Sequence, residues 1–155
     1  LRSGTRETWP VETLGLRYRH SELPSDAIVV AATLRLRPGD AGEIRDEISE
    51  IKQWRREHQP INDPNCGSVF ANPEGDSAGR LVEAVGGKTL RVGGATVSEM
   101  HANFIVTTPG TTAADVRTLI RTLRQRVADE FGIVLRPEVQ MVGDFDDGGL
   151  DVTVG

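Results

Sequence analysis

The chain has 155 residues, which is enough for one domain of ordinary size, or for one domain and a fragment of another. Eighteen Lys and Arg against 23 Asp and Glu give a net charge of −5. This charge argues against a nucleic-acid partner, because such proteins usually present basic surface to phosphates. No apolar run approaches the ~20 residues that span a bilayer, so no membrane partner is expected. The single cysteine, Cys66, excludes an internal disulfide, which fits a soluble protein of the reducing cytoplasm.

The first part of the chain contains one clear pattern. Residues 14–21 are polar and predict a loop, whereas residues 28–36 alternate strictly and predict a strand that ends at Pro38 and Gly39. Few residues upstream offer this strand a pairing partner. We therefore expect the chain to begin inside a larger unit.

A helix is predicted next. Asp40 and Glu43 have the spacing of a capping box, and Ile44, Ile48 and Ile51 follow at helical spacing. The helix should end before Pro60. Residues 59–76 are rich in proline and glycine and show no helical or strand period, which predicts a long functional loop.

The remaining pattern alternates helices with short strands. The predicted elements are a short helix capped by Ser77 and ended by Gly86-Gly87, an irregular hairpin over 90–97, a strand over 103–107, a helix from Thr112 to Phe131, and a strand over 133–142 that contains Pro137. After Asp144 the sequence is rich in Asp and Gly and predicts a mobile tail. From residue 39 on, this order indicates a small α+β or α/β layer.

The first candidate for chemistry is the loop around Ser68. Gly67 would let the backbone approach a ligand, and the Ser68 hydroxyl can donate a proton. Alternatively, Ser68 is a turn serine that bonds its own backbone. Cys66 could act as a nucleophile, but no histidine lies near it in sequence, and a buried apolar role is the other reading.

Two charged residues are further candidates. Glu138 interrupts an apolar strand, so it either faces solvent at a sheet edge or enters a site. Arg19 is either a solvated side chain or a fork for a carboxylate substrate. The histidines at 20, 58 and 101 are too far apart in sequence for a zinc pattern, so no metal is predicted. The glycine pairs at 86–87 and 93–94 are read as turns, not as a phosphate-binding loop.

Several collinear motifs resemble the UDP-N-acetylenolpyruvoylglucosamine reductase (MurB) family. The first is Gln59-Pro-Ile-Asn-Asp-Pro-Asn-Cys-Gly-Ser-Val-Phe-Ala-Asn-Pro73, which resembles the segment that carries the family's catalytic serine. The others, in the family's order, are Gly75-Asp-Ser-Ala-Gly-Arg-Leu81, Val92-Gly-Gly-Ala95, Val97-Ser-Glu-Met-His-Ala-Asn-Phe-Ile-Val106 and Leu135-Arg-Pro-Glu-Val139. Tyr18-Arg-His-Ser21 and the 28–37 strand resemble the end of the family's flavin-binding region. The likeness covers residues 14–143.

The resemblance implies a cytoplasmic flavoprotein reaction in peptidoglycan precursor synthesis. In it, UDP-N-acetylglucosamine enolpyruvate is reduced to UDP-N-acetylmuramate, with FAD and NADPH as cofactors. Ser68 would protonate the carbanion, while Arg19 and Glu138 would stabilise the enolic intermediate. Asn72, His101 and Tyr18 match substrate-contacting positions.

Two departures from the family's pattern matter here. Ala71 stands where the family usually has a lysine, and the Gly-rich loops that bind the flavin pyrophosphate are missing from this chain. The resemblance also implies the fold, which is α+β, with a small sheet covered by helices. It divides the chain into the end of an FAD-binding domain (1–38), a substrate-binding domain with the serine (39–145) and a flexible tail (146–155).

Three functional hypotheses follow. The chain is one part of the reductase and works with the missing FAD-binding half, or it is an isolated UDP-sugar-binding domain, or it is a non-catalytic remnant. Saturable binding of the UDP-sugar separates the second from the third. Flavin-dependent NADPH oxidation separates the first from both.

Overall fold

The computed structural model describes residues 4–24 and 26–143, so the predicted tail lies outside the described residues. The chain divides into two compact units, Leu1–Ala41 and Gly42–Gly155. Each unit is considered by itself. No helix among the described residues combines the length and the apolar character needed to cross a membrane.

The first unit holds a short 3₁₀ helix, η1 (Val11–Leu14), and a tight turn closed by two backbone hydrogen bonds of 3.1 Å between Arg17 and His20. The predicted strand over 28–36 is wrong. The structure assigns no strand there, and its apolar side chains are exposed. The alternation of apolar and other residues over 28–36 is compatible with a strand in a sheet. A strand forms, however, only when a neighbouring strand supplies hydrogen bonds, and none of the described residues does so.

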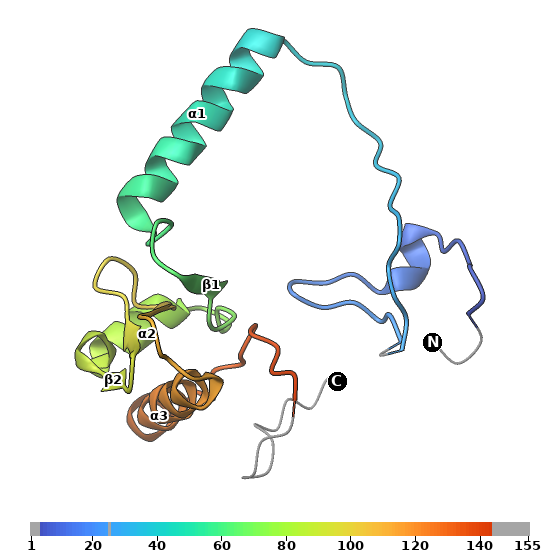
Figure 1. Cartoon of the computed structure of the whole chain (residues 1–155). Helices are drawn as coiled ribbons and strands as arrows, with labels where there is room; N and C mark the ends of the chain where they lie inside the picture. Colours follow the sequence, from blue (N-terminus) through green and yellow to red (C-terminus); the bar gives the residue numbers. More distant parts are fainter. Residues whose placement is uncertain (1–3, 25, 144–155) are drawn as a thin grey trace. The chain divides into compact units, whose positions relative to one another are not determined.

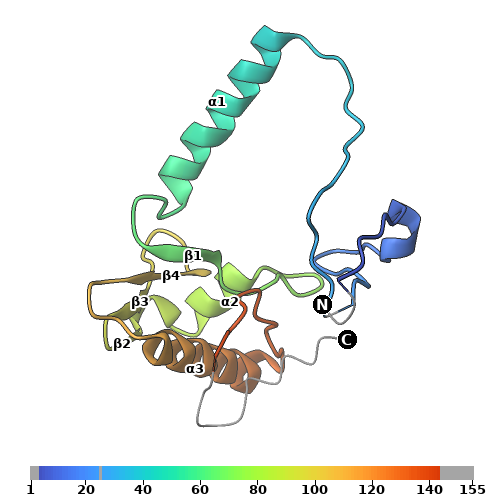
Figure 2. The same cartoon turned by 45° about the vertical axis from the view of Figure 1, so that its right-hand side comes forward.

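Helix α1 (Ala41–His58) confirms the predicted helix, and all of it except Ala41 belongs to the second unit. A four-stranded antiparallel sheet follows, in the order β1-β4-β3-β2 (Figures 1 and 2). Its strands are β1 (Asn65–Ser68), β2 (Arg91–Val92), β3 (Ala95–Val97) and β4 (Phe104–Thr107). The hairpin and the strand predicted over 103–107 are confirmed. The predicted loop over 59–76 missed β1, because its four residues have no alternation and become a strand only by pairing with β4.

Two helices pack with this sheet. The Ser77 hydroxyl accepts the Arg80 N–H and begins α2 (Ala78–Ala84), which leads through η2 (Gly87–Thr89) into β2. α3 (Ala113–Phe131) begins at a full capping box between Thr112 and Asp115 and ends at a left-handed Gly132. Both helices start and end as their local sequence signals predict.

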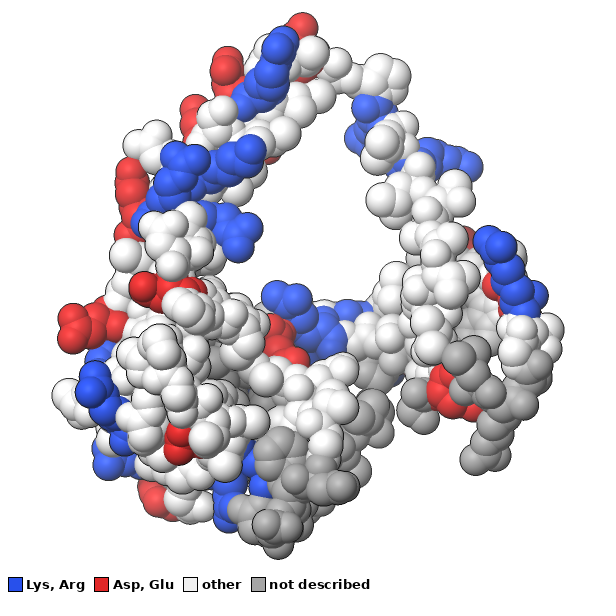
Figure 3. Space-filling model, in the orientation of Figure 1, with Lys and Arg blue, Asp and Glu red and all other residues white. Residues whose placement is uncertain are grey.

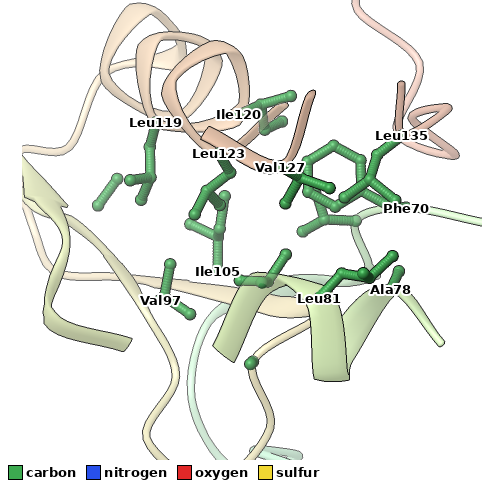
Figure 4. Packing of buried hydrophobic residues seen from close by; sticks show 14 residues of the cluster. Phe70, Ala78, Leu81, Val97, Ile105, Leu119, Ile120, Leu123, Val127 and Leu135 are labelled. Carbon is green, nitrogen blue, oxygen red and sulfur yellow. The ribbon is translucent and has the colours of Figure 1, made fainter. Parts of the chain in front are cut away.

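The core lies between α3, α2 and the sheet (Figure 4). The stripe predicted on α3 supplies Leu119, Ile120, Leu123 and Val127, and these meet residues of α2, the strands and the segments around Phe70 and Leu135. A small antiparallel sheet packed with helices is an α+β fold, as expected. The predicted strand over 133–142 reduces to one isolated bridge between Phe70 and Pro137.

Candidate active site

The candidate site begins at a bulge in β1. Asn65 pairs with Val106 and Ser68 pairs with Phe104. Between these two pairs β1 contains one residue more than β4, which makes a β-bulge. Gly67 sits inside this bulge with φ +83°, a backbone conformation that side-chain-bearing residues rarely adopt. Bulges re-aim the residue that follows them, and here that residue is Ser68.

The Asn65 side chain stabilises the bulge through three hydrogen bonds to the backbone. Its Oδ1 accepts the Gly67 N–H at 2.8 Å, and its Nδ2 donates to the carbonyls of Pro60 and Asp63 at 2.8 and 2.7 Å. In the described part of the chain, the half-buried Ser68 makes no side-chain hydrogen bond. The alternative prediction, in which the Ser68 hydroxyl hydrogen-bonds its own backbone in a turn, is therefore wrong.

Asn103 fixes the loop directly after the serine. Its Oδ1 accepts the Phe70 N–H at 2.9 Å and its Nδ2 donates to the Phe70 carbonyl at 2.8 Å, while its own carbonyl accepts the Val69 N–H at 2.8 Å. The side chain thus pairs with the Phe70 backbone as a strand would. The strand pattern predicts Asn103 only as the start of a strand, although an amide beside apolar strand residues is the signal of a buried hydrogen-bonding partner.

Glu138 lies beside the serine loop. Its backbone N–H donates to the Val69 carbonyl at 2.8 Å, and the Ala71 N–H donates to the Arg136 carbonyl at 2.9 Å. Pro137 stands between these bonds, opposite Phe70, at a position where the ladder needs no N–H. The Glu138 side chain is half-buried and its Oε1 is shielded from solvent. The backbone of Glu138 therefore lies across the ladder from Val69, the residue that follows Ser68.

Asn72 and His101 both contact the first turn of α2. Asn72 Oδ1 accepts the Ala78 N–H at 3.0 Å, and the His101 ring packs against Gly79 and edge-on to Phe104, with centroids 4.9 Å apart. His101 Nδ1 accepts the Asn103 N–H at 3.2 Å, which places the proton of the neutral ring on Nε2. Burial lowers the pKa of His101, so the ring is neutral at pH 7.

Tyr18 and Arg19 belong to the other unit. They form the two-residue tip of the turn closed by Arg17 and His20, and both are exposed. Arg19 has φ +52°, a strained conformation for a residue with a side chain. The grouping of these two residues with Ser68 stays a prediction.

Cys66 lies in the bulge beside Gly67 but also belongs to a different feature. Together with Ile105, Val116 and Arg117 it lines a cavity of about 570 Å³ that includes none of Ser68, Asn72, His101 or Glu138. Cys66 is exposed, so the expected buried apolar role is wrong. Partial desolvation of its thiol still raises the pKa of Cys66, which disfavours the thiolate that a nucleophile needs.

The Gly93-Gly94 turn does not fit a flavin pyrophosphate. A Cβ at Gly93 would meet the Asp115 carboxylate within 2.7 Å, and one at Gly94 would meet the Thr111 and Thr108 hydroxyls within the same distance. The space beside these two glycines is therefore occupied by side chains of the same chain. One of them is the Asp115 carboxylate, which would repel a phosphate group. Within residues 4–24 and 26–143, no three His, Cys, Asp or Glu side chains group to hold a metal.

These observations define a class of protein: a small α+β domain with a serine hydroxyl and a carboxylate on neighbouring segments at one sheet edge. The family model for the C-terminal domain of UDP-N-acetylenolpyruvoylglucosamine reductase matches residues 59–142. The chain belongs to this family.

Curated relatives agree with the family match. A UDP-N-acetylenolpyruvoylglucosamine reductase from Anaeromyxobacter sp. (strain Fw109-5) is 49% identical over 88% of this chain and 43% of its own length. One from Sphingopyxis alaskensis is 48% identical over 92% of this chain and 48% of its own length. The crystal structure of UDP-N-acetylenolpyruvylglucosamine reductase (MurB) from Thermus caldophilus is 40% identical with a TM-score of 0.70, covering 83% of this chain and 46% of that chain. The chain thus spans less than half the length of these relatives.

Proposed function

We propose that this chain supplies the substrate-binding part of a flavin-dependent reductase. The whole protein would use NADPH and FAD to reduce UDP-N-acetylglucosamine enolpyruvate to UDP-N-acetylmuramate, in the cytoplasm, for peptidoglycan precursor synthesis. The observation that supports this proposal is the backbone ladder that joins Val69 to Glu138, because it places the segment of Glu138 next to the segment of Ser68 in a domain of this family.

Each residue has a distinct part in the proposal. Once hydride has added to the vinyl carbon, the O–H bond of Ser68 breaks and its proton goes to the carbon beside the substrate carboxylate. Solvent then reprotonates the serine oxygen. Glu138 and Arg19 would stabilise the enolic intermediate, Arg19 by offsetting its negative charge. Asn72, His101 and Tyr18 would contact the substrate.

The rigid setting of Ser68 supports its role. Asn65 stabilises the bulge before Ser68, and Asn103 hydrogen-bonds the backbone of Phe70 after it. The Ser68 hydroxyl therefore has a fixed position and makes no hydrogen bond within the described part of the chain. A proton donor that must meet a short-lived carbanion benefits from such preorganisation. Asn72 is partly engaged already as a cap of α2, which leaves its amide N–H groups for a substrate.

A flavin bound elsewhere in the whole protein would supply the hydride, since the Gly93-Gly94 turn of this chain does not fit its pyrophosphate. The cofactors therefore belong to the proposal about the complete enzyme. The half that binds them is the partner we propose for this chain.

The test measures NADPH oxidation by the purified chain with added FAD and UDP-N-acetylglucosamine enolpyruvate, together with flavin absorbance. We expect neither flavin nor turnover from the chain alone, and substrate-dependent turnover when the flavin-binding half of a relative is added. In that assembly Ser68→Ala should still allow flavin reduction by NADPH but should slow substrate reduction at least 100-fold. Unchanged substrate reduction by this variant would exclude Ser68 as the proton donor.

A second function is favoured by the self-contained core between α2, α3 and the sheet. A domain with its own core can bind the UDP-sugar by itself and reduce nothing. Titration of the chain with UDP-N-acetylglucosamine enolpyruvate, followed by amide shifts at Asn72 and His101, should then saturate. A non-catalytic remnant would show no saturable shift.

A further inference from the structure

Arg136 lies on the segment that pairs with the residues after Ser68. The Ala71 N–H donates to the Arg136 carbonyl at 2.9 Å. Two residues further on, the Glu138 N–H donates to the Val69 carbonyl at 2.8 Å. Residues two apart in an antiparallel ladder extend their side chains on the same side of it. The side chains of Arg136 and Glu138 therefore leave the ladder on one side.

Arg136 and the residue opposite it differ in size and charge. Ala71 ends at its Cβ and is 6% exposed, whereas Arg136 is exposed. The backbone on either side of Arg136 is held in place, because Arg124 Nε donates to the Leu135 carbonyl at 2.9 Å and Pro137 follows with a restricted φ. The base of the Arg136 side chain is thus fixed, while its guanidinium end reaches solvent.

The candidate site residues follow one another along this ladder. Ser68 directly precedes the residue that pairs with Glu138, and Arg136 comes next along the ladder, opposite Ala71. Asn72 follows on the chain, and His101 packs against the same first turn of α2 that Asn72 caps. Arg136 therefore lies between the segment of Ser68 and Glu138 at one end and the pair of Asn72 and His101 at the other.

Two other basic side chains near these residues are paired with acidic ones. Arg80 bonds the Asp76 carboxylate, and Lys88 Nζ, close to His101, donates to Glu83 Oε1 at 2.9 Å. Figure 3 shows acidic and basic side chains interspersed over the second unit. Such pairs balance their own charges and offer an anionic ligand little net attraction. Arg136 differs in place, because it extends from the ladder itself.

We propose that the Arg136 guanidinium binds the diphosphate group of the nucleotide sugar, an inference that rests on the proposed function. The enolpyruvyl group would lie at Ser68 and Glu138, and the nucleotide would lie beyond Arg136, towards Asn72 and His101. A guanidinium matches two phosphate oxygens at once, and it can do so with one edge while another N–H group bonds a protein acceptor. Arg136 would thereby determine which end of the substrate faces the serine.

The test titrates the 155-residue chain with UDP, and amide shifts and phosphorus NMR report the binding. Arg136→Gln removes the charge and keeps a long polar side chain, while Arg136→Lys keeps the charge without the planar fork. The matched control is Arg91→Gln, which removes an exposed arginine from β2, at the opposite edge of the sheet from β1. Because the bond to Ala71 uses the Arg136 carbonyl, all three variants should keep the melting temperature of the chain.

We expect Arg136→Gln to raise the Kd for UDP at least 10-fold and to reduce the change in the phosphorus shifts on binding. The Kd of Arg136→Lys should fall between that of Arg136→Gln and that of the unmodified chain, and the control should stay within twofold. An Arg136→Gln Kd within twofold of the unmodified chain, an equal loss in Arg91→Gln, or no saturable binding of UDP by the unmodified chain would overturn the inference.

Failure of the proposed function gives a different result. In the assembly with the flavin-binding half of a relative, Arg136→Gln should raise the KM for UDP-N-acetylglucosamine enolpyruvate at least 10-fold and leave kcat within threefold, whereas Ser68→Ala lowers kcat. If Arg136→Gln weakens UDP binding but the assembly shows no substrate-dependent NADPH oxidation, the role of Arg136 stands and the reductase proposal is wrong. Turnover with an unchanged KM in Arg136→Gln would leave the reductase proposal standing and overturn the role of Arg136.

Discussion

Replacing Asn103 by alanine should destabilise the domain strongly. Asn103 is 5% exposed and Phe70 is 1% exposed, so the substitution leaves the Phe70 N–H and carbonyl without partners in a dry place. Each unsatisfied buried group costs about 1–3 kcal/mol. The two together predict a loss of about 2–6 kcal/mol in the free energy of unfolding, which lowers Tm by roughly 10 °C or more for a domain of this size.

The assay must report on the sheet and its helices. Trp9 and Trp54 both lie outside residues 59–142, so tryptophan fluorescence is not suitable. Thermal and urea unfolding followed by far-UV circular dichroism is the better measurement. The control is Asn62→Ala, which removes an exposed amide from the loop before β1 and should change the free energy of unfolding by less than ~0.5 kcal/mol.

Asn103→Asp separates the two hydrogen bonds. A carboxylate can still accept the Phe70 N–H but repels the Phe70 carbonyl, so the introduced carboxyl should have its pKa raised in the folded state. Its stabilising, protonated form is then present at low pH and lost as pH rises through the folded pKa. The stability deficit against the unmodified chain should therefore shrink between pH 7 and pH 4. A deficit of less than ~1 kcal/mol for Asn103→Ala, or one equal to that of Asn62→Ala, would refute the role of this clamp.

Three further perturbations test local features of the domain. Because burial lowers the pKa of His101, the unfolded chain binds protons first as pH falls below ~6.5, so stability should decrease there, and a proton NMR titration should place the ring pKa below that value. The Arg80 guanidinium bonds Asp76 and lowers the pKa of that carboxyl to about 2; carboxyl NMR should show this midpoint, and Arg80→Gln should return it toward 3.8. Gly93→Ala should cost about 1–3 kcal/mol, measured by urea unfolding, because φ is +53° and its methyl would strike Asp115, which caps α3.

Controls sharpen these three tests. Gly110→Ala has a positive φ but open space, so it should cost less than Gly93→Ala, and an equal cost would show that the contact with Asp115 does not matter. His101→Phe should abolish the decline in stability below pH 6.5, and an unchanged decline would assign it to another group. An Asp76 midpoint that Arg80→Gln leaves at about 2 would contradict the pairing.

The sequence by itself determined the parts of this protein that depend on neighbours in the chain. The isoleucine spacing and the end before Pro60 predicted α1, and the Thr112–Asp115 box and Gly132 predicted α3. The motif around Ser68 indicated the family and the candidate serine. Caps, periodicity and motifs involve residues a few positions apart, so the linear pattern contains them.

Only the tertiary structure decided which segments pair. It made β1 from a stretch without alternation, left 28–36 without a strand, and reduced 133–142 to a single bridge at Pro137. It also brought Asn103 to Phe70, 33 positions away, and Glu138 to Val69. These bonds join distant residues, and a strand or a clamp exists only when its partner is present, so no local signal could have specified them.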